Sequence, residues 1–573
     1  MLLQELEFLA FHVHDTKHLL KSDVFADLDH DTLFAALEAA DSLARRSFEP
    51  IAARIDQEEP QLLDGKAVAS PALAQPLRDY ADLGFLAATF PREWGGLDAP
   101  SIINGATMAL FGAACTPAAG YLFLTAAAAR LILNFGSDAQ RATYLPPMLA
   151  GRWFGTMCLS EPQAGSSLHH ITTRAIPDAD GEFQIKGAKM WISGGDHDLS
   201  ENIVHLVLAR IVTDGEPSNA LSLFIVPRQR PDGHGNDVMV TGLNKKLGHK
   251  ATTNCALSFG ENGACKGYLL GEPHQGLQHM FQMMNEARVG VGTTSAATAY
   301  AGYRYALAYA AERRQGRRAG TQTPARLVEH PDIRRMLLEQ KAIAEGGLCL
   351  SLRGAYLIDQ IRIATDNEER QRLQGLLDIL TPLIKLWCAE RGLEANSLAI
   401  QTMGGAGYVR DHPVERLFRD QRLNPIHEGT NGILAIDLLM RKAKQGAGLS
   451  PLFEAIEIDT VSAKNDEPAI ADALLSGMAI VRQCISKVID DKSDTDRLLA
   501  FASPIALMLG DLVASWLWLA QVRALAGRND PFAQGKRAAA AHMVHHVWPK
   551  SLALAPAIMA GAAPCLAIEE RAL

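Results

Sequence analysis

The sequence lacks the paired cysteines of a disulfide framework or a zinc site. Its eight cysteines are spread over 573 residues, and no two of them form a Cys-x-x-Cys pair. Scattered cysteines are typical of free thiols in a reducing compartment. Basic residues are slightly outnumbered, with 55 Lys and Arg against 64 Asp and Glu and a formal net charge of −9. Because this balance gives no general attraction for nucleic acid, we do not expect a nucleic-acid partner.

Signals for export and membrane insertion are also scarce. The first residues, MLLQELEFLAFHVHD, contain acids and no basic n-region, which is unlike a signal or transit peptide. The main uncharged apolar stretch is the Ala-rich segment at 117–129, whose small residues favour close helix packing over a membrane span. These features predict a cytoplasmic location, and they give no support for peripheral membrane contact.

The spacing of apolar residues divides the chain into several regions. The length exceeds what one hydrophobic core holds, and 48% hydrophobic with 21% charged residues is typical of globular domains. Helical spacing gives way to short β-rich runs and then returns, which predicts a mainly α protein with a β middle domain. The expected segments are an N-terminal extension at 1–30, a helical domain at 31–150, a β domain at 151–270, a helical bundle at 271–446 and a C-terminal helical extension at 447–573.

The segment HEGTNG at 427–432 places one carboxylate, Glu428, at a glycine-hinged start of an apolar helix. Either Thr430 or Asn431 can cap that helix through its side-chain oxygen, which leaves Glu428 free. Among apolar neighbours a carboxylate has a raised pKa, which suits a base that removes a carbon-bound proton. These residues alone favour a plainer alternative, an exposed first-turn Glu stabilised by the helix dipole. Other segments of the chain favour the catalytic base over the exposed first-turn Glu.

Two segments of the expected β domain have features of a ligand site. MCLSEPQAGSS at 157–167 is a strand end followed by a loop whose N–H and hydroxyl groups could bind a ring edge or a phosphate. KMWISGG at 189–195 places Trp191 beside a glycine turn, where its indole could cover a planar cofactor. Taken singly, the two segments fit an ordinary turn and a core tryptophan better.

Three other clusters carry weaker signals. AERRQGRR at 311–318 brings four arginines to a helix end, where they could bind a pyrophosphate, although solvated charge explains them better without context. GGAGY at 404–408 lacks the GxGxxG spacing and the strand–helix setting of Rossmann and P-loop sites. His542, His545 and His546 share helical spacing without a carboxylate cluster, so we predict no metal site.

Seven ordered segments resemble the acyl-CoA dehydrogenase family over about residues 30–445. They are MCLSEPQAGSS, KMWISGG, MNEAR, ERRQGR, LVEHPDIRRM, QTMGGAGYVRD and IHEGTNGI. GDHDLSENIVHLVLAR at 195–210, TPLIKLW at 381–387 and the terminal extensions are similar to the 3-methylmercaptopropionyl-CoA dehydrogenase branch. The resemblance implies a helical N-terminal domain, a β-barrel-like middle domain, a four-helix bundle and an added C-terminal helical domain.

The resemblance also implies FAD as the cofactor, bound by the middle domain, the bundle and a neighbouring subunit of a homodimer or a dimer of dimers. The positions that match cofactor contacts of the family are Met157, Leu159, Ser160, Gly165 and Ser166 at the flavin ring and phosphates, Trp191, Ile192 and Ser193 on its outer face, Arg313 at the pyrophosphate, His330, Gln401, Gly404 and Gly405 across the subunit interface, and Thr430 and Asn431 in the catalytic loop.

For the reaction, the resemblance implies that Glu428 removes a proton from Cα of an acyl-CoA while a hydride leaves Cβ for the flavin, giving a trans-2-enoyl-CoA as in fatty acid β-oxidation. The backbone N–H of Glu428 and a ribityl hydroxyl would stabilise the charge on the thioester carbonyl. Electron-transferring flavoprotein would accept the electrons. The positions that match substrate contacts are Ser166, Asn285, Arg288 and Gly429.

Several positions depart from the family pattern and leave the acyl group open. They are Ser160 for Thr, Gly165-Ser166-Ser167 for Gly-Ser-Asp, His427 for Tyr, Ala406 for His and Ala287 for Glu. Both 3-methylmercaptopropionyl-CoA and a medium- or long-chain fatty acyl-CoA are expected substrates. Neither the oligomeric state nor the physiological electron acceptor follows from the sequence.

Three alternative functions stay open at this point. An acyl-CoA oxidase would share the reaction and pass electrons to oxygen. A non-catalytic flavoprotein of this fold would bind DNA or another partner, for which a basic C-terminal domain is expected and absent. Amphipathic C-terminal helices could also bind a membrane surface, as in long-chain members with a similar extension.

Overall fold

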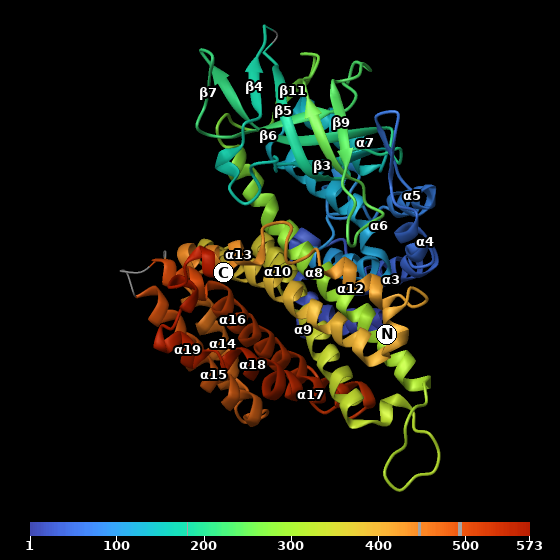
Figure 1. The fold of residues 1–573 in the computed structure, drawn as a ribbon, viewed down its shortest axis with the longest axis vertical. Helices are drawn as coiled ribbons and strands as arrows, with labels where there is room; N and C mark the ends of the chain where they lie inside the picture. The colour runs from blue at the N-terminus through green and yellow to red at the C-terminus, as the bar shows by residue number, and fades with distance from the viewer. Residues whose placement is uncertain (180, 445–447, 491–494) are drawn as a thin grey trace. The chain divides into compact units, whose positions relative to one another are not determined.

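The computed structural model describes every residue except 180, 445–447 and 491–494. Its contacts form two compact units (Figure 1). The first unit comprises Met1–Glu38, Pro100–Ala113 and Arg288–Leu573, and the second comprises Ala39–Ala99 and Ala114–Ala287. The five segments expected from the sequence stay a prediction, and the boundary expected between 446 and 447 lies outside the described residues.

The second unit is built around a barrel-like sheet of nine strands (Figure 1). The strand order is β11-β8-β6-β4-β5-β10-β9, with β3 and β7 paired to β6, and β11 also pairs with β5, which closes the ring. The closure confirms the expected β-barrel-like middle domain. The strands are β3 (Trp153–Cys158), β4 (Arg174–Pro177), β5 (Phe183–Ser193), β6 (Asn202–Thr213), β7 (Glu216–Pro217), β8 (Ser222–Pro227), β9 (Val238–Leu243), β10 (Asn254–Phe259) and β11 (Lys266–Leu269).

Strand β6 is buried on both faces, which explains its nearly continuous apolar sequence. Val204 and Leu206 belong to the core that includes Leu131 and Tyr144 of the neighbouring helices. Val207, which follows Leu206, belongs to a second core on the opposite face of the strand. The period of two along the strand therefore divides its side chains between two cores.

The helices expected in the first 150 residues are largely present, but the sequence reasoning missed a hairpin at 61–68. Asp64 and Gly65 both have left-handed backbone conformations, with φ of 50° and 76°, as an Asp-Gly hairpin turn requires. The helix at 74–82 ends at Asp82, and Gly84 (φ 79°) lies in the turn that follows. The elements are α1 (Leu2–Glu7), α2 (Thr16–Leu19), α3 (His30–Leu43), α4 (Ala52–Gln57), β1 (Gln61–Leu63), β2 (Lys66–Val68), α5 (Ala74–Asp82), α6 (Ser101–Phe135) and α7 (Asp138–Leu149).

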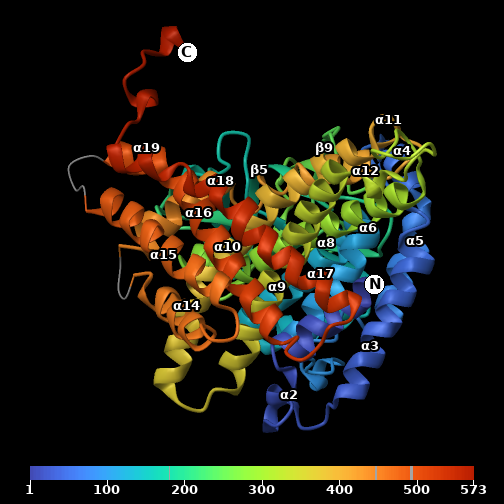
Figure 2. The same ribbon diagram turned by 90° about the horizontal axis from the view of Figure 1, so that it is seen from below.

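The first unit is built from helices. The long helices α9 and α10 pack along each other, and α16 contacts both of them as well as α15, α17 and α18 (Figures 1 and 2). The helices after the sheet are α8 (Gly276–Glu312), α9 (Pro331–Ile363), α10 (Asn367–Met403), α11 (Gly405–Tyr408), α12 (Val414–Gln421), α13 (Asn431–Asp437), α14 (Ser450–Ser462), α15 (Pro468–Ile489), α16 (Thr495–Arg523), α17 (Pro531–His542), α18 (Trp548–Leu552) and α19 (Ala555–Ala560).

Buried polar contacts join the C-terminal helices to α10. Asp511 of α16 accepts hydrogen bonds from Trp387 Nε1 at 2.7 Å, from Arg391 Nε at 3.0 Å and from Ser551 Oγ at 2.6 Å. The side chains of Asp511 and Arg391 are almost completely shielded from water. The C-terminal helices are thus connected to α10 through a buried ion pair as well as apolar packing.

A second buried charge cluster joins the two ends of the chain. Lys536 of α17 forms ion pairs with Glu5 of α1 and, at 2.9 Å, with Glu345 of α9. All three side chains are buried. Burial is the main cause that raises the pKa of Glu5 to about 7, and the Glu345 carboxylate adds to it. The N-terminal extension is therefore part of the same core as the C-terminal helices.

Three helices among the described residues are long and apolar enough, by length and composition, to span a bilayer: α6, α15 and α16. The sequence reasoning singled out only the Ala-rich part of α6. Within these helices 50%, 44% and 72%, respectively, of the most apolar window is buried inside the protein. Much of the apolar surface of α16 is covered by α9, α10, α15, α17 and α18.

Candidate active site

The segment 427–432 forms the turn that leads into α13. Glu428 and Gly429 both have left-handed backbone conformations, with φ of 53° and 87°. This conformation is uncommon for a residue with a side chain, and it costs on the order of 1–3 kcal/mol. Thr430 Oγ1 accepts a hydrogen bond from the Ile433 N–H at 3.3 Å, so Thr430 and not Asn431 caps α13.

Glu428 lies before this cap and is half-buried, so it differs from the exposed first-turn Glu considered as the alternative. Burial is the main influence on Glu428 and raises its pKa, whereas Arg288 and Lys385 act in the opposite direction. A Cβ atom placed on Gly429 would lie 3.8 Å from Arg288 Nη2, which locates this cation at the turn. A carboxylate with a raised pKa beside two cations is suited to accept a proton from carbon.

Lys385 of α10 contacts the same turn and was missed as a site residue from the sequence. Its Nζ is shielded from water and donates to Gly429 O at 2.7 Å and to Asn431 Oδ1 at 2.9 Å. Burial is the main cause that lowers the pKa of Lys385 to about 7, while Glu428 opposes the decrease. The available signal was a lone lysine within the apolar run PLIKLW.

In the second unit, the segments around 157–160 and 189–193 are adjacent. The Met190 N–H donates to Ser160 O at 3.0 Å, just after the end of β3, which contains Met157 and is followed by Leu159. Gly165 and Ser166 are exposed, and there is open space where a Gly165 side chain would be. Ile192 is buried and Ser193 is half-buried. The sequence-predicted residues of this unit therefore lie at the end of β3, in the loop that follows it and on β5.

Trp191 is not a core residue, which corrects the alternative that its sequence favoured. Its side chain is 60% exposed although it lies within β5. Its φ of 65° places the backbone in the left-handed region, which is a genuine outlier for a bulky residue. A large indole held in water by a strained backbone is consistent with a surface that a ligand covers.

A buried ion pair supports the loop that begins at Leu159. Lys189 Nζ lies 3.0 Å from Glu161 Oε1 and donates to Leu159 O at 3.0 Å, and both charged side chains are buried. Glu161 also accepts the N–H groups of Thr172 at 2.8 Å and Thr173 at 3.0 Å. Burial would raise the pKa of Glu161, but Lys189 and the threonine hydrogen bonds outweigh it and lower the pKa to about 2. This pair was not found from the sequence.

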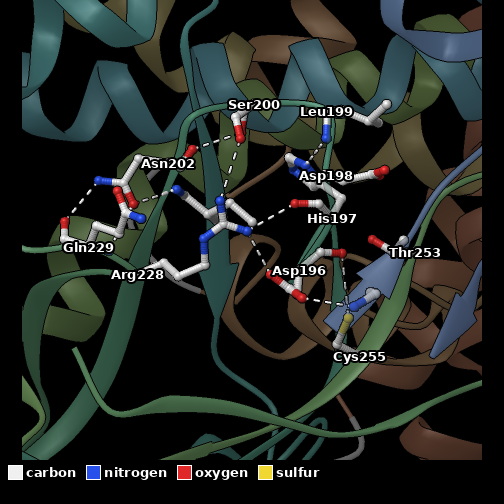
Figure 3. A network of polar contacts seen from close by, with 12 residues as sticks. Asp196, His197, Asp198, Leu199, Ser200, Asn202, Arg228, Gln229, Thr253 and Cys255 are labelled. Carbon is white, nitrogen blue, oxygen red and sulfur yellow. Dashed lines mark hydrogen bonds and ion pairs between the residues drawn. The ribbon is translucent and has the colours of Figure 1, made fainter. Parts of the chain in front are cut away.

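The turn after Ser193 is fixed by a network around Arg228 (Figure 3). Arg228 Nη1 donates to Asp196 Oδ1 at 2.8 Å and to His197 O at 2.9 Å, and Asp196 Oδ2 accepts the Ala67 N–H at 2.9 Å. His197 is buried, and its pKa is lowered to about 3 by burial. The network links the turn to β2, which contains Ala67, and to the end of β8, which Arg228 directly follows.

Replacing Arg228 by Met is expected to lower stability by about 1–3 kcal/mol, because it leaves Asp196 and three backbone carbonyls without their donor. The thermal unfolding midpoint measures this loss. Arg152→Met is the matched control, since Arg152 is 55% exposed and pairs with Glu201 of the same turn at 3.2 Å. Its expected effect is below about 1 kcal/mol. Equal shifts for the two variants would contradict a stabilising role of the network.

The remaining predicted cofactor contacts of the first unit lie around the ends of α8 and α10. Arg313 is exposed just beyond α8, so the arginines of 313–318 lie in a loop and not within the helix. Its carbonyl accepts the Leu327 N–H at 2.8 Å, and His330 Nε2 lies 2.8 Å from Gln315 O. An apolar cluster joins the ends of α8 and α10 to the start of α9. Gln401 lies in the last turn of α10, Gly404 and Gly405 come directly after this helix, and all three are exposed.

The other predicted positions are distributed over the fold. Asn285 is half-buried on α8, three residues before Arg288 and hence on the same helix face. His542 and His546 stack with ring centroids 4.7 Å apart, and His542 is buried. Within the described part of the chain, no group of three or more His, Cys, Asp or Glu side chains could hold a metal ion. All eight cysteines are free, and seven of them are buried.

Family models account for nearly the whole chain in order. The acyl-CoA dehydrogenase N-terminal domain matches residues 31–152, the middle domain matches 156–261, and the C-terminal domain matches 274–443. A model described as acetyl-CoA dehydrogenase C-terminal like matches residues 453–569. The chain belongs to the acyl-CoA dehydrogenase family. It is an oxidoreductase that acts on a CH–CH bond of an acyl-CoA, and it carries the additional C-terminal domain.

Relatives of similar length support this assignment. The acyl-CoA dehydrogenase described here is 33% identical to 3-methylmercaptopropionyl-CoA dehydrogenase of Ruegeria pomeroyi over 94% of both chains. It is 30% identical to the broad-specificity linear acyl-CoA dehydrogenase FadE5 of Mycobacterium tuberculosis, over 92% of this chain and 90% of that protein.

Solved structures of low sequence identity share the fold. Caenorhabditis elegans ACDH-11 in complex with C11-CoA superposes with a TM-score of 0.77 at 18% identity, covering 93% of this chain and 91% of that one. An acyl-CoA dehydrogenase of Bacillus anthracis complexed with FAD has a TM-score of 0.72 at 20% identity, covering 95% and 97%. Both comparisons include the C-terminal helical domain, which confirms the predicted fold class.

Proposed function

We propose that this acyl-CoA dehydrogenase binds FAD and desaturates a linear acyl-CoA between Cα and Cβ, with Glu428 as the base. The observation that carries the proposal is the turn at Glu428. A half-buried carboxylate with a raised pKa is held in a left-handed backbone conformation beside Arg288 and Lys385. Such a group has little value for stability, but it is suited to proton transfer from carbon.

The residues present fit a flavin. Trp191 offers an exposed indole face, Gly165 and Ser166 offer backbone groups in an open loop, and Gly404 with Gly405 leaves open space for close backbone approach. Arg313 is exposed and offers a guanidinium for phosphate oxygens. When bound, FAD supplies the acceptor for the hydride that leaves Cβ.

The residues of the chain supply the rest of the chemistry. The Glu428 carboxylate accepts the Cα proton, and the electron pair of that C–H bond becomes part of the new Cα–Cβ double bond as the hydride departs. The Glu428 backbone N–H donates to the thioester carbonyl and stabilises the negative charge that develops there. Arg288 and Lys385 provide positive charge beside the same turn. A water-poor site keeps the carboxylate basic.

The proposed substrates are 3-methylmercaptopropionyl-CoA and linear medium- or long-chain acyl-CoA. The two long relatives are named for 3-methylmercaptopropionyl-CoA and for linear acyl-CoA of broad specificity, and both align with nearly all of this chain. We further propose electron-transferring flavoprotein as the electron acceptor, a homodimer as the assembly and the cytoplasm as the location. These proposals follow from the family resemblance and from the cysteine pattern.

The test is the visible spectrum of the purified protein before and after anaerobic addition of a panel of acyl-CoA thioesters. We expect an oxidised flavin band that 3-methylmercaptopropionyl-CoA or a linear acyl-CoA bleaches. Hydrogen peroxide formed in proportion to product in air would favour the oxidase alternative. A yellow protein that none of the thioesters bleaches would contradict the proposed substrates, and a colourless protein that FAD cannot reconstitute would contradict the cofactor.

A further inference from the structure

We propose that Lys385 is a positioning residue of the reaction, which holds the turn of Glu428 in its active conformation by binding Gly429 and Asn431, on either side of Thr430. The inference rests on the proposed function, because it takes Glu428 as the base. Lys385 lies on α10, and its side chain is fully buried where it reaches the turn. It lies within the TPLIKLW segment but is not among the catalytic, cofactor or substrate positions that the resemblance implied.

The contacts of Lys385 fix the backbone immediately after the base. Its Nζ donates to the carbonyl of Gly429 at 2.7 Å and to the side chain of Asn431 at 2.9 Å. Two consecutive left-handed residues, Glu428 and Gly429, precede the second contact. Because such a conformation persists only where surrounding contacts impose it, the two hydrogen bonds offset its cost and select it.

Asn431 extends the attachment to a second point on α10. Its Nδ2 donates to Glu390 Oε1 at 2.9 Å and to Leu386 O at 3.4 Å. The start of α13 is therefore joined to α10 by one buried cation and one buried amide. A displacement of the turn would break both sets of contacts, so the position of the Glu428 carboxylate depends on the side chain of Lys385.

The charge of Lys385 acts on Glu428 in addition to its hydrogen bonds. The cations that face Glu428 are Arg288 on α8 and Lys385 on α10, and both act to lower its pKa. Asp437 and Arg441, which follow the turn, act on Arg288, and Glu390 acts on Lys385. If the Lys385 charge is removed, Arg288 alone opposes the effect of burial. The pKa of Glu428 then rises, and the carboxylate becomes protonated at a higher pH.

Core packing alone does not explain a lysine at this position. An ammonium group taken from water into the protein loses favourable solvation, which a leucine or methionine in the same space would not lose. The structure shows that cost in the lowered pKa of Lys385. The compensation is the contact with the turn that carries the base.

The experiment measures anaerobic flavin reduction by stopped flow as a function of pH in Lys385→Met, Lys385→Arg and Glu428→Gln. For Lys385→Met we expect a roughly 10–100-fold lower limiting rate, because a displacement of about 1 Å at a reacting group costs this much. The acidic limb of its pH–rate profile should move to higher pH. FAD content and acyl-CoA affinity should change less than about threefold, since neither ligand contacts Lys385 in this proposal.

Lys385→Arg keeps the charge with a different hydrogen-bond geometry, so its limiting rate should fall while its acidic limb stays close to that of the wild type. Lys442→Met is the matched control, because Lys442 follows α13 and pairs with Asp378 at 3.6 Å without contacting the turn. The control should keep the wild-type rate.

The outcomes separate the inference from the proposed function. A wild-type rate and acidic limb in Lys385→Met, with no turnover in Glu428→Gln, would overturn the role of Lys385 alone. Flavin reduction that survives in Glu428→Gln would overturn the proposed base. If Lys385→Met fails to fold, Lys385→Arg decides, since a wild-type limiting rate in that variant would exclude a dependence on the hydrogen-bond geometry.

Discussion

Flavin reduction by acyl-CoA is expected to slow roughly 10³-fold when Glu428 is replaced by Gln, because removal of a general base costs about this factor. The variant keeps the size of the side chain and loses its capacity to accept a proton. The Glu428 backbone N–H remains, so acyl-CoA should still bind. FAD content should be unchanged, which the spectrum of the purified variant reports. Single-turnover stopped-flow traces give the rate of the chemical step.

The pH dependence of the wild-type reaction has a defined sign. Glu428 must be deprotonated to act as the base, and burial raises its pKa. The rate should therefore fall as the pH decreases through this raised value.

Glu415→Gln is the control for Glu428→Gln, because Glu415 lies on the preceding helix α12 and pairs with Arg419. That variant should turn over normally. Residual activity above about a tenth of wild type in Glu428→Gln would exclude the assigned role, since a lost base costs at least 10²-fold.

The largest loss of stability is expected for Asp511→Asn. Asp511 is the counter-ion of the buried Arg391 and accepts the Trp387 indole N–H. Breaking a buried ion pair by removing one partner typically costs 3–5 kcal/mol, because the other charge stays buried without compensation. The thermal unfolding midpoint should fall by several degrees, measured by circular dichroism.

Glu394→Gln provides the matched control for the same arginine. Glu394 pairs with Arg391 Nη1 at 2.8 Å, but its side chain is 46% exposed. An exposed partner contributes less than about 1 kcal/mol, so the midpoint should barely move. A larger shift in the control than in Asp511→Asn would show that the buried contact does not hold the C-terminal helices to α10.

Regular periodicity made much of the fold predictable. The helices and the strands β5, β6 and β8 follow local apolar patterns, which a sequence displays directly. The closure of the sheet depends on β11 pairing with both β8 and β5, and this pairing has no local signal. The β1–β2 hairpin did have one, the Asp64-Gly65 turn, which helical spacing on either side obscured.

The site could be predicted where one short motif contains the chemistry. Glu428 and its glycine hinge are adjacent in sequence, and the capping alternatives were reduced to Thr430 or Asn431. Lys385 acts on that turn from 44 residues away, and Lys189 reaches Glu161 from 28 residues away. Such supporting contacts depend on the packing of separate elements, which residue spacing does not report.

The contact between Glu5 and Lys536 has a consequence for synthesis of the protein. Its two partners are separated by 531 positions, so the first helix leaves the ribosome long before its counter-charge exists. Nascent chains grow at about 5–20 residues per second, which leaves roughly half a minute or more before the lysine emerges. During that interval the apolar face of the amino-terminal helix has no native partner in α17. This core is therefore completed only after α17 has been synthesised, and a chain truncated before α17 would expose the same surface to chaperones.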